Sequence, residues 1–140
     1  MRMLRLFFDY GTYFVWIREE EHVSAPVRIS SDGYFADDIY LLDGTHKINK
    51  YYEDRLIGQS ELESMTNYIN NEYPKLFINN EYEFSYKGFD SKEDEQRFDD
   101  AVRFVYNKLC ELLGDDYEII NDTGYGMPEQ DNEQDLKQSL

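Results

Sequence analysis

Residues 91–113 carry the clearest hydrophobic pattern in the chain. Their apolar positions recur every three or four residues, at Phe98, Ala101, Val102, Val105, Leu109, Leu112 and Leu113. Asp90 or Ser91 is a suitable N-cap, and the acidic residues of the first turn favour a helix start because the helix dipole stabilises negative charge there. Gly114 is typical of a residue that follows a helix end. The pattern therefore predicts one long helix.

A shorter helical pattern precedes it over residues 60–73. Ser60 and Glu63 match the S-x-x-E capping box, and Pro74 must end the helix because proline cannot continue it. Apolar residues at helix-like intervals also predict a short helix over residues 47–57. The sequence thus predicts one or two shorter helices beside the long one.

Three segments have the composition of strands. Residues 3–9 form an apolar run, and residues 12–17 are rich in β-branched and aromatic side chains. The intervening Tyr10-Gly11 is a turn signal, so we expect a hairpin. Residues 117–120 follow the long helix and its glycine, and a strand in this position usually returns to a sheet. We expect this closing strand to pair beside the first strand.

The middle of the chain gives weaker patterns. Residues 27–29 predict a short strand, and residues 30–33 have turn chemistry. Residues 34–42 are consistent with one further strand. Residues 76–86 alternate poorly, which predicts a loop with at most an edge strand at residues 82–84.

These elements predict a single α+β domain over residues 1–122. Its sheet, antiparallel or mixed, would combine the N-terminal hairpin with the C-terminal strand and pack against the long helix. Beyond the closing strand, Gly124, Gly126 and Pro128 interrupt the pattern, and residues 129–137 are acidic and low in apolar side chains. We therefore expect residues 123–140 to form an acidic, disordered tail.

Charge restricts the function. The 140 residues include 30 Asp and Glu against 14 Lys and Arg, a net charge of −16, together with 13 Tyr and 9 Phe. Such a field repels nucleic acid and anionic membranes and attracts basic proteins. No apolar run approaches a membrane span, and the first residues lack the long apolar stretch of a signal peptide. We therefore expect a cytoplasmic protein that binds neither nucleic acid nor membrane directly.

Catalytic and metal-binding motifs are missing from the sequence. His22 and His46 are far apart and have no ligand-like spacing, so no metal site and no cofactor are predicted. Cys110 lies beside apolar positions of the long helix, which favours a partly buried structural thiol. The paired acids Asp99-Asp100 fall on the polar face of that helix, where solvated carboxylates are expected. The sequence predicts a binding protein rather than an enzyme.

The surface itself then becomes the candidate site. Carboxylates set among tyrosine rings offer a basic cleft both charge pairing and aromatic contact area. The residues predicted to contact a partner are Glu19, Glu20, Glu21, Asp37, Asp38, Tyr51, Tyr52, Asp94 and Glu95. The predicted partner is a basic protein, and the sequence leaves formation of a homo-oligomer open.

Five runs follow one another in a characteristic order, residues 4–11 (LRLFFDYG), 14–17 (FVWI), 60–62 (SEL), 89–93 (FDSKE) and 109–120 (LCELLGDDYEII). Their order resembles that of small immunity proteins of bacterial polymorphic and contact-dependent toxin systems. The resemblance covers roughly residues 4–17 and 60–120, and residues 19–59 are not matched.

This resemblance implies a stoichiometric inhibitor that occludes one toxin domain, often a nuclease, and it carries over no catalytic residues. Three other readings of the sequence remain open. One is a phage-encoded acidic blocker of a host defence nuclease, which gene neighbourhood would separate from an immunity protein. Another is a small enzyme, recognisable by a deep pocket with several acids of perturbed pKa. The last is a homodimeric adaptor.

Overall fold

A mixed four-stranded sheet forms the centre of the protein, in the strand order β10-β1-β2-β3. The computed structural model describes residues 2–18, 25–36, 39–40, 46–48 and 51–127. The four strands are β1 (Arg2–Leu6), β2 (Val15–Arg18), β3 (Ala25–Val27) and β10 (Tyr117–Asn121).

The sheet confirms the two strand pairings expected from the sequence. β1 and β2 are antiparallel, with Leu4 opposite Ile17, so the N-terminal hairpin is present. β10 lies on the other side of β1 and runs parallel to it, with Leu4 opposite Ile119. A parallel neighbour needs a crossover connection, which the rest of the chain supplies. The first strand is therefore the central strand through which the two ends of the domain meet.

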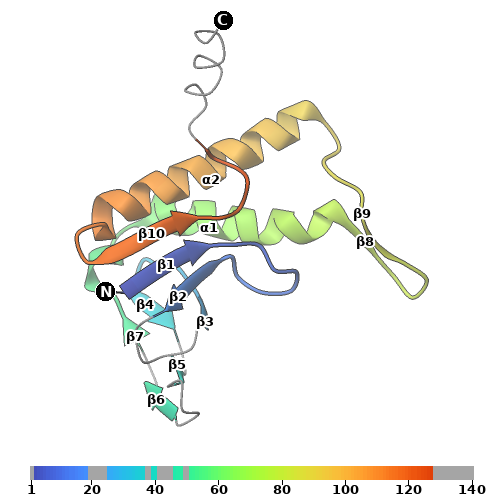
Figure 1. The fold of residues 1–140 in the computed structure, drawn as a ribbon. Helices are drawn as coiled ribbons and strands as arrows, with labels where there is room; N and C mark the ends of the chain where they lie inside the picture. The colour runs from blue at the N-terminus through green and yellow to red at the C-terminus, as the bar shows by residue number, and fades with distance from the viewer. Residues whose placement is uncertain (1, 19–24, 37–38, 41–45, 49–50, 128–140) are drawn as a thin grey trace, which may run out of the picture.

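Two helices cover one face of this sheet (Figure 1). They are α1 (Ser60–Glu72) and α2 (Lys92–Leu113). The helix residues Leu62 and Val105 share one buried cluster with Leu4 of the sheet, whereas the next strand residue, Arg5, is exposed. This alternation is what a strand with one covered face requires. The predicted α+β class, with a small sheet against a long C-terminal helix, is confirmed.

The ends of α2 agree with the sequence. Ser91 is the N-cap, and its Oγ accepts a hydrogen bond from the Asp94 backbone N–H at 3.0 Å. Glu93, Asp94 and Glu95 form the acidic first turn. The helix ends at Leu113, where Gly114 donates its N–H to the Cys110 carbonyl at 2.9 Å. Local capping and periodicity are therefore sufficient to set this element.

The predicted capping box of α1 is wrong. Gln59 is the N-cap and makes no side-chain capping bond. The Glu63 carboxylate instead accepts the backbone N–H of Ser31 at 2.9 Å, across the fold. This hydrogen bond lowers the pKa of Glu63 below its ordinary value. The end of the helix does follow the sequence, because Pro74 lies in a short 3-10 helix, η2 (Tyr73–Leu76), directly after it.

The described residues between 46 and 56 form strands and a 3-10 turn instead of the predicted helix. The elements are β6 (His46–Ile48), β7 (Tyr51–Tyr52) and η1 (Asp54–Leu56). The strand predicted over residues 34–42 overlaps β4 (Tyr34–Ala36) and β5 (Ile39–Tyr40), and its remaining residues lie outside the described part of the chain. β4 pairs with β7, and β5 pairs with β6. Aromatic and β-branched residues favour such pairing, and it outweighs a helical spacing that extends over few turns.

Residues 76–86 are also more ordered than the expected loop. They form a hairpin of β8 (Phe77–Asn79) and β9 (Phe84–Tyr86), which extends away from the sheet and helices (Figure 1). Within the described residues, β8 and β9 pair only with each other. Across the described part of the chain, no helix combines the length and apolar character needed to cross a membrane.

The chain after β10 turns back onto α2. Tyr125 packs edge-on against the buried Phe98 at 5.2 Å between ring centroids, and the Gly126 N–H donates to Asp99 Oδ1 at 2.7 Å. Gly126 has a φ of +67°, and a Cβ on it would lie 2.6 Å from the Arg103 backbone nitrogen. Residues 123–127, which the pattern assigned to the tail, therefore lie against α2. Residues 128–140 of that tail lie outside the described residues.

Candidate functional site

A buried carboxylate, Glu53, is the first group to consider as an active centre. Only 7% of this residue is exposed. Arg55 Nε donates to its carboxylate at 2.9 Å, Arg55 Nη2 at 3.2 Å and the Tyr117 hydroxyl at 3.1 Å. Burial alone raises the pKa of Glu53, but the hydrogen bonds from Arg55 and Tyr117 outweigh it and hold that pKa below its ordinary value. Glu53 is therefore an ionised carboxylate with internal partners.

The same network joins separate elements of the fold. Arg55 Nη1 lies 2.9 Å from Asp116 Oδ2, just before β10, and Asp116 is 3.9 Å from Arg2 of β1. The Arg2 guanidinium stacks 4.2 Å above the Tyr117 ring. These contacts attach η1 to the end of the central sheet. We assign the network to stability rather than chemistry.

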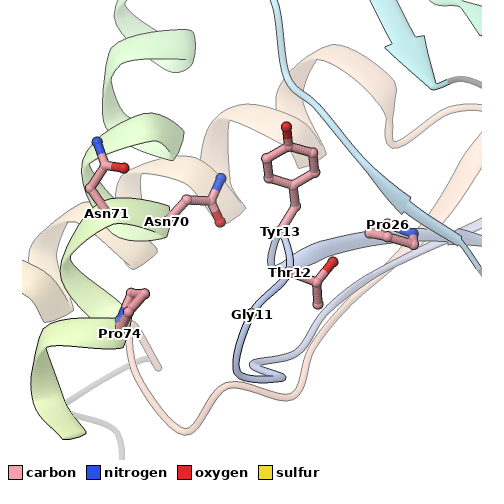
Figure 2. Close-up of a pocket in the computed structure, with 7 residues that line it drawn as sticks. All are labelled: Gly11, Thr12, Tyr13, Pro26, Asn70, Asn71 and Pro74. Atoms are coloured by element: carbon pink, nitrogen blue, oxygen red, sulfur yellow. The ribbon is translucent and has the colours of Figure 1, made fainter. Parts of the chain in front are cut away.

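One hollow among the described residues has an uncharged wall (Figure 2). Its volume is about 470 Å³, and it lies between the β1–β2 turn and the C-terminal end of α1. Its lining is Gly11, Thr12, Tyr13, Pro26, Asn70, Asn71 and Pro74. The Asn70 side-chain oxygen accepts the Phe14 backbone N–H at 3.1 Å, which ties the turn to α1. A wall without carboxylate, thiol or imidazole does not resemble the acidic pocket expected of a carboxylate enzyme.

A smaller hollow of about 290 Å³ lies between η2 and the start of α2 and contains opposite charges. Lys87 Nζ is 3.6 Å from Asp90, and Lys75 Nζ is 3.0 Å from Glu72. Asp94, one of the predicted contact residues, also lines it. In the part of the chain that the structure describes, no group of three or more His, Cys, Asp or Glu residues is placed to hold a metal ion.

Positive and negative side chains differ in how often they form ion pairs at the described surface. Most described cations form an ion pair with a neighbouring acid, as Arg5 does with Asp122 at 2.7 Å and Arg103 with Asp99 at 2.8 Å. Several exposed acids form no ion pair with a described cation, namely Asp9, Asp32, Asp54, Glu61, Glu81, Glu83, Glu93, Glu95, Asp115 and Glu118. The described surface is therefore negatively charged, because many of its carboxylates have no cation beside them.

The predicted contact residues fall into separate places. Glu19, Glu20, Glu21, Asp37 and Asp38 lie outside the described residues. Tyr51 belongs to β7, where its backbone pairs with Ala36.

The remaining three lie at opposite ends of the molecule. Tyr52, also in β7, is 55% exposed, and its ring lies 5.5 Å from that of Tyr34. Asp94 and Glu95 lie in the first turn of α2, far from β7 (Figure 1). Asp94 is 3.3 Å from Arg97, whereas Glu95 is exposed. The structure does not bring Tyr52 together with Asp94 and Glu95.

The β8–β9 hairpin, residues 77–86, presents an aromatic surface that sequence analysis missed. We call it the aromatic arm. Tyr82 is 88% exposed, Phe84 56% and Tyr86 58%. The Phe77 and Phe84 rings stack at 5.3 Å between centroids. The available signal was a pair of aromatic runs on either side of Asn79-Asn80, which is typical of a hairpin.

The fold and its surface define a class of protein: a small α+β domain with a two-helix layer and an exposed aromatic hairpin. Comparison of the chain with protein-family models, with curated proteins and with solved structures found no match. The resemblance to immunity proteins therefore enters only as a proposal below.

Proposed function

We propose that this protein is an immunity protein that binds a cognate toxin domain, a nuclease, and occludes its basic active-site cleft. The observation that carries the proposal is the surplus of exposed carboxylates over unpaired cations, set beside exposed tyrosine and phenylalanine rings. The order of elements, which resembles that of immunity proteins, supports the same function. The protein would act in the cytoplasm of the cell that makes the toxin.

A nuclease must bind a polyanion, and this requirement sets the charge of its active-site cleft. A nuclease contacts the phosphate backbone through lysine and arginine, so its cleft is positively charged. Carboxylates can occupy the same positions as phosphates, whereas a chain of net charge −16 repels the nucleic acid itself. Opposite net charges also accelerate association of the two proteins.

Ion pairs within the protein reduce the positive potential of its own cations. Arg55 is held by Glu53 and Asp116, and Arg103 by Asp99 and Asp100, so these cations add little positive potential at the surface. The enzyme alternative has less support, because one described hollow carries no carboxylate and the three acids of the other, Glu72, Asp90 and Asp94, each form an ion pair. A binding surface is therefore the function that the geometry supports best.

Co-expression with the product of the neighbouring toxin gene tests this function. We expect the protein to restore growth to cells that produce the toxin and to co-purify with it in equal amounts. Because the attraction is electrostatic, the Kd is expected to rise by about tenfold or more between about 50 mM and about 500 mM NaCl. Failure to bind the toxin, or a Kd that salt does not change, would contradict the proposal.

A further inference from the structure

The aromatic arm has more exposed ring surface than its own fold requires. Phe77 and Tyr86 are directly opposite each other across the hairpin, as are Asn79 and Phe84, so the rings gather on one face. Tyr10, from the β1–β2 turn, packs edge-on against Phe77 at 5.2 Å and against Phe84 at 4.9 Å. Even with Tyr10 in place, more than half of Phe84 remains exposed.

The arm is rigid enough to present these rings without a large entropic cost. At its tip, the Asn80 side-chain oxygen accepts the backbone N–H groups of Tyr82 at 2.8 Å and Glu83 at 3.0 Å. Along its side, Asn79 Nδ2 donates to the Tyr10 hydroxyl at 3.0 Å. At its base, the Lys87 N–H donates to the Leu76 carbonyl at 2.7 Å. Such a preorganised element loses little conformational freedom when it binds.

The charges of the arm indicate what it would bind. Glu81 and Glu83 lie at the exposed tip, and neither forms an ion pair with a described cation. In the described chain the cations stacked on rings are Arg5 over Phe7 and Arg2 over Tyr117, both on the central sheet. The exposed rings of Tyr82 and Phe84 thus lie near two carboxylates that have no described cation as partner, although Glu83 also accepts the Ser85 hydroxyl at 2.6 Å.

We propose that the aromatic arm is the element that enters the basic cleft of the partner protein. Glu81 and Glu83 pair with lysine or arginine side chains of the cleft, and the rings of Tyr82 and Phe84 pack against its guanidinium groups and apolar walls. This inference rests on the proposed function and names the surface that performs it. A second copy of the chain is a poor occupant, because two arms would place unpaired carboxylates of the same sign together.

Calorimetric titration with a catalytically inactive form of the neighbouring toxin tests the arm. The aromatic variant is Tyr82→Ser with Phe84→Ser, and the acidic variant is Glu81→Gln with Glu83→Gln. We expect the aromatic variant to raise the Kd by about 100-fold and the acidic variant by about tenfold.

Two matched variants control for hydrophobicity and charge elsewhere on the surface. Tyr13→Ser with Ile57→Ser removes two exposed apolar side chains outside the arm and outside the predicted contact residues, and Glu93→Gln with Glu118→Gln removes two exposed carboxylates. Both are expected to change the Kd by less than about threefold. Circular dichroism melting of every variant verifies that the domain remains folded.

The outcomes separate the inference from the proposed function. If the native protein binds the toxin and the arm variants bind it equally well, the inference is overturned and the proposed function stands. If the native protein does not bind the toxin, the proposed function fails and the inference fails with it. Sedimentation that finds a dimer which the aromatic variant dissociates would assign the arm to a second copy and would also overturn the inference.

Discussion

The aromatic rings of the domain centre and those of the aromatic arm are chemically alike but have opposite environments. Phe98 and Tyr117 are almost completely buried between sheet and helices, whereas Tyr82 and Phe84 are largely exposed on a two-stranded hairpin. A hairpin of two strands is marginally stable by itself and depends on contacts at its base. Rings at the centre therefore stabilise the fold, whereas those of the arm are accessible from solvent.

The strongest way to break this comparison is to truncate one ring in each region. Phe98→Ala removes a fully buried side chain that contacts Phe8, Phe89 and Tyr125, so it is expected to lower the free energy of unfolding by about 3–5 kcal/mol. The matched arm variant, Phe84→Ala, is expected to lower it by less than about 1 kcal/mol. Urea denaturation measures both. Equal losses would show that the arm belongs to the cooperative core.

A second test asks whether the turn after β10 packs as part of the core. Gly126→Ala places a Cβ 2.6 Å from the Arg103 backbone nitrogen at a positive φ, so the expected destabilisation is about 2–4 kcal/mol. Gly124 also has a positive φ but has open space around it, so Gly124→Ala should cost only about 1–2 kcal/mol. Thermal melting compares the two variants. A similar loss in both would mean that the turn is not packed against α2.

The smallest expected effect concerns pH. The pKa values of Glu53 and Glu63 are below the ordinary value of 4.5, so both groups stabilise the fold above that pH and lose this contribution as the pH falls through their folded pKa values. Glu53→Gln is expected to cost about 1–2 kcal/mol at neutral pH and to flatten the acid limb of the stability curve. Glu81→Gln in the arm should change stability by less than about 0.5 kcal/mol. Denaturation between pH 3 and pH 7 measures both, and an unchanged acid limb in Glu53→Gln would contradict the first expectation.

The chemical character of the candidate surface could be predicted from the sequence, but the positions of its residues in the fold could not. Composition alone predicts an excess of carboxylates and tyrosines, and the exposed acids of the described surface agree with it. Tyr52 and Asp94 were both expected to contact the partner at one interface. In the structure β7 and the start of α2 lie at opposite ends of the molecule (Figure 1). The arm was missed because part of its packing comes from Tyr10, a residue 67 positions before Phe77.

The sequence by itself determined the elements whose signals are local. α2 follows from its repeating apolar positions and its Ser91 cap, and the β1–β2 hairpin follows from two apolar runs around a turn. These features involve residues of one continuous segment, so their hydrogen bonds and side-chain contacts are largely specified without the rest of the chain.

Only the tertiary structure decided the elements that depend on distant partners. Glu63 accepts the Ser31 N–H instead of closing a capping box, and β7 pairs with β4 instead of continuing a helix. Gly126 lies against α2 because β10 brings the chain back across it. In each case a contact between residues far apart in sequence outweighs a local preference of at most about 1 kcal/mol, which is why the local pattern could not predict it.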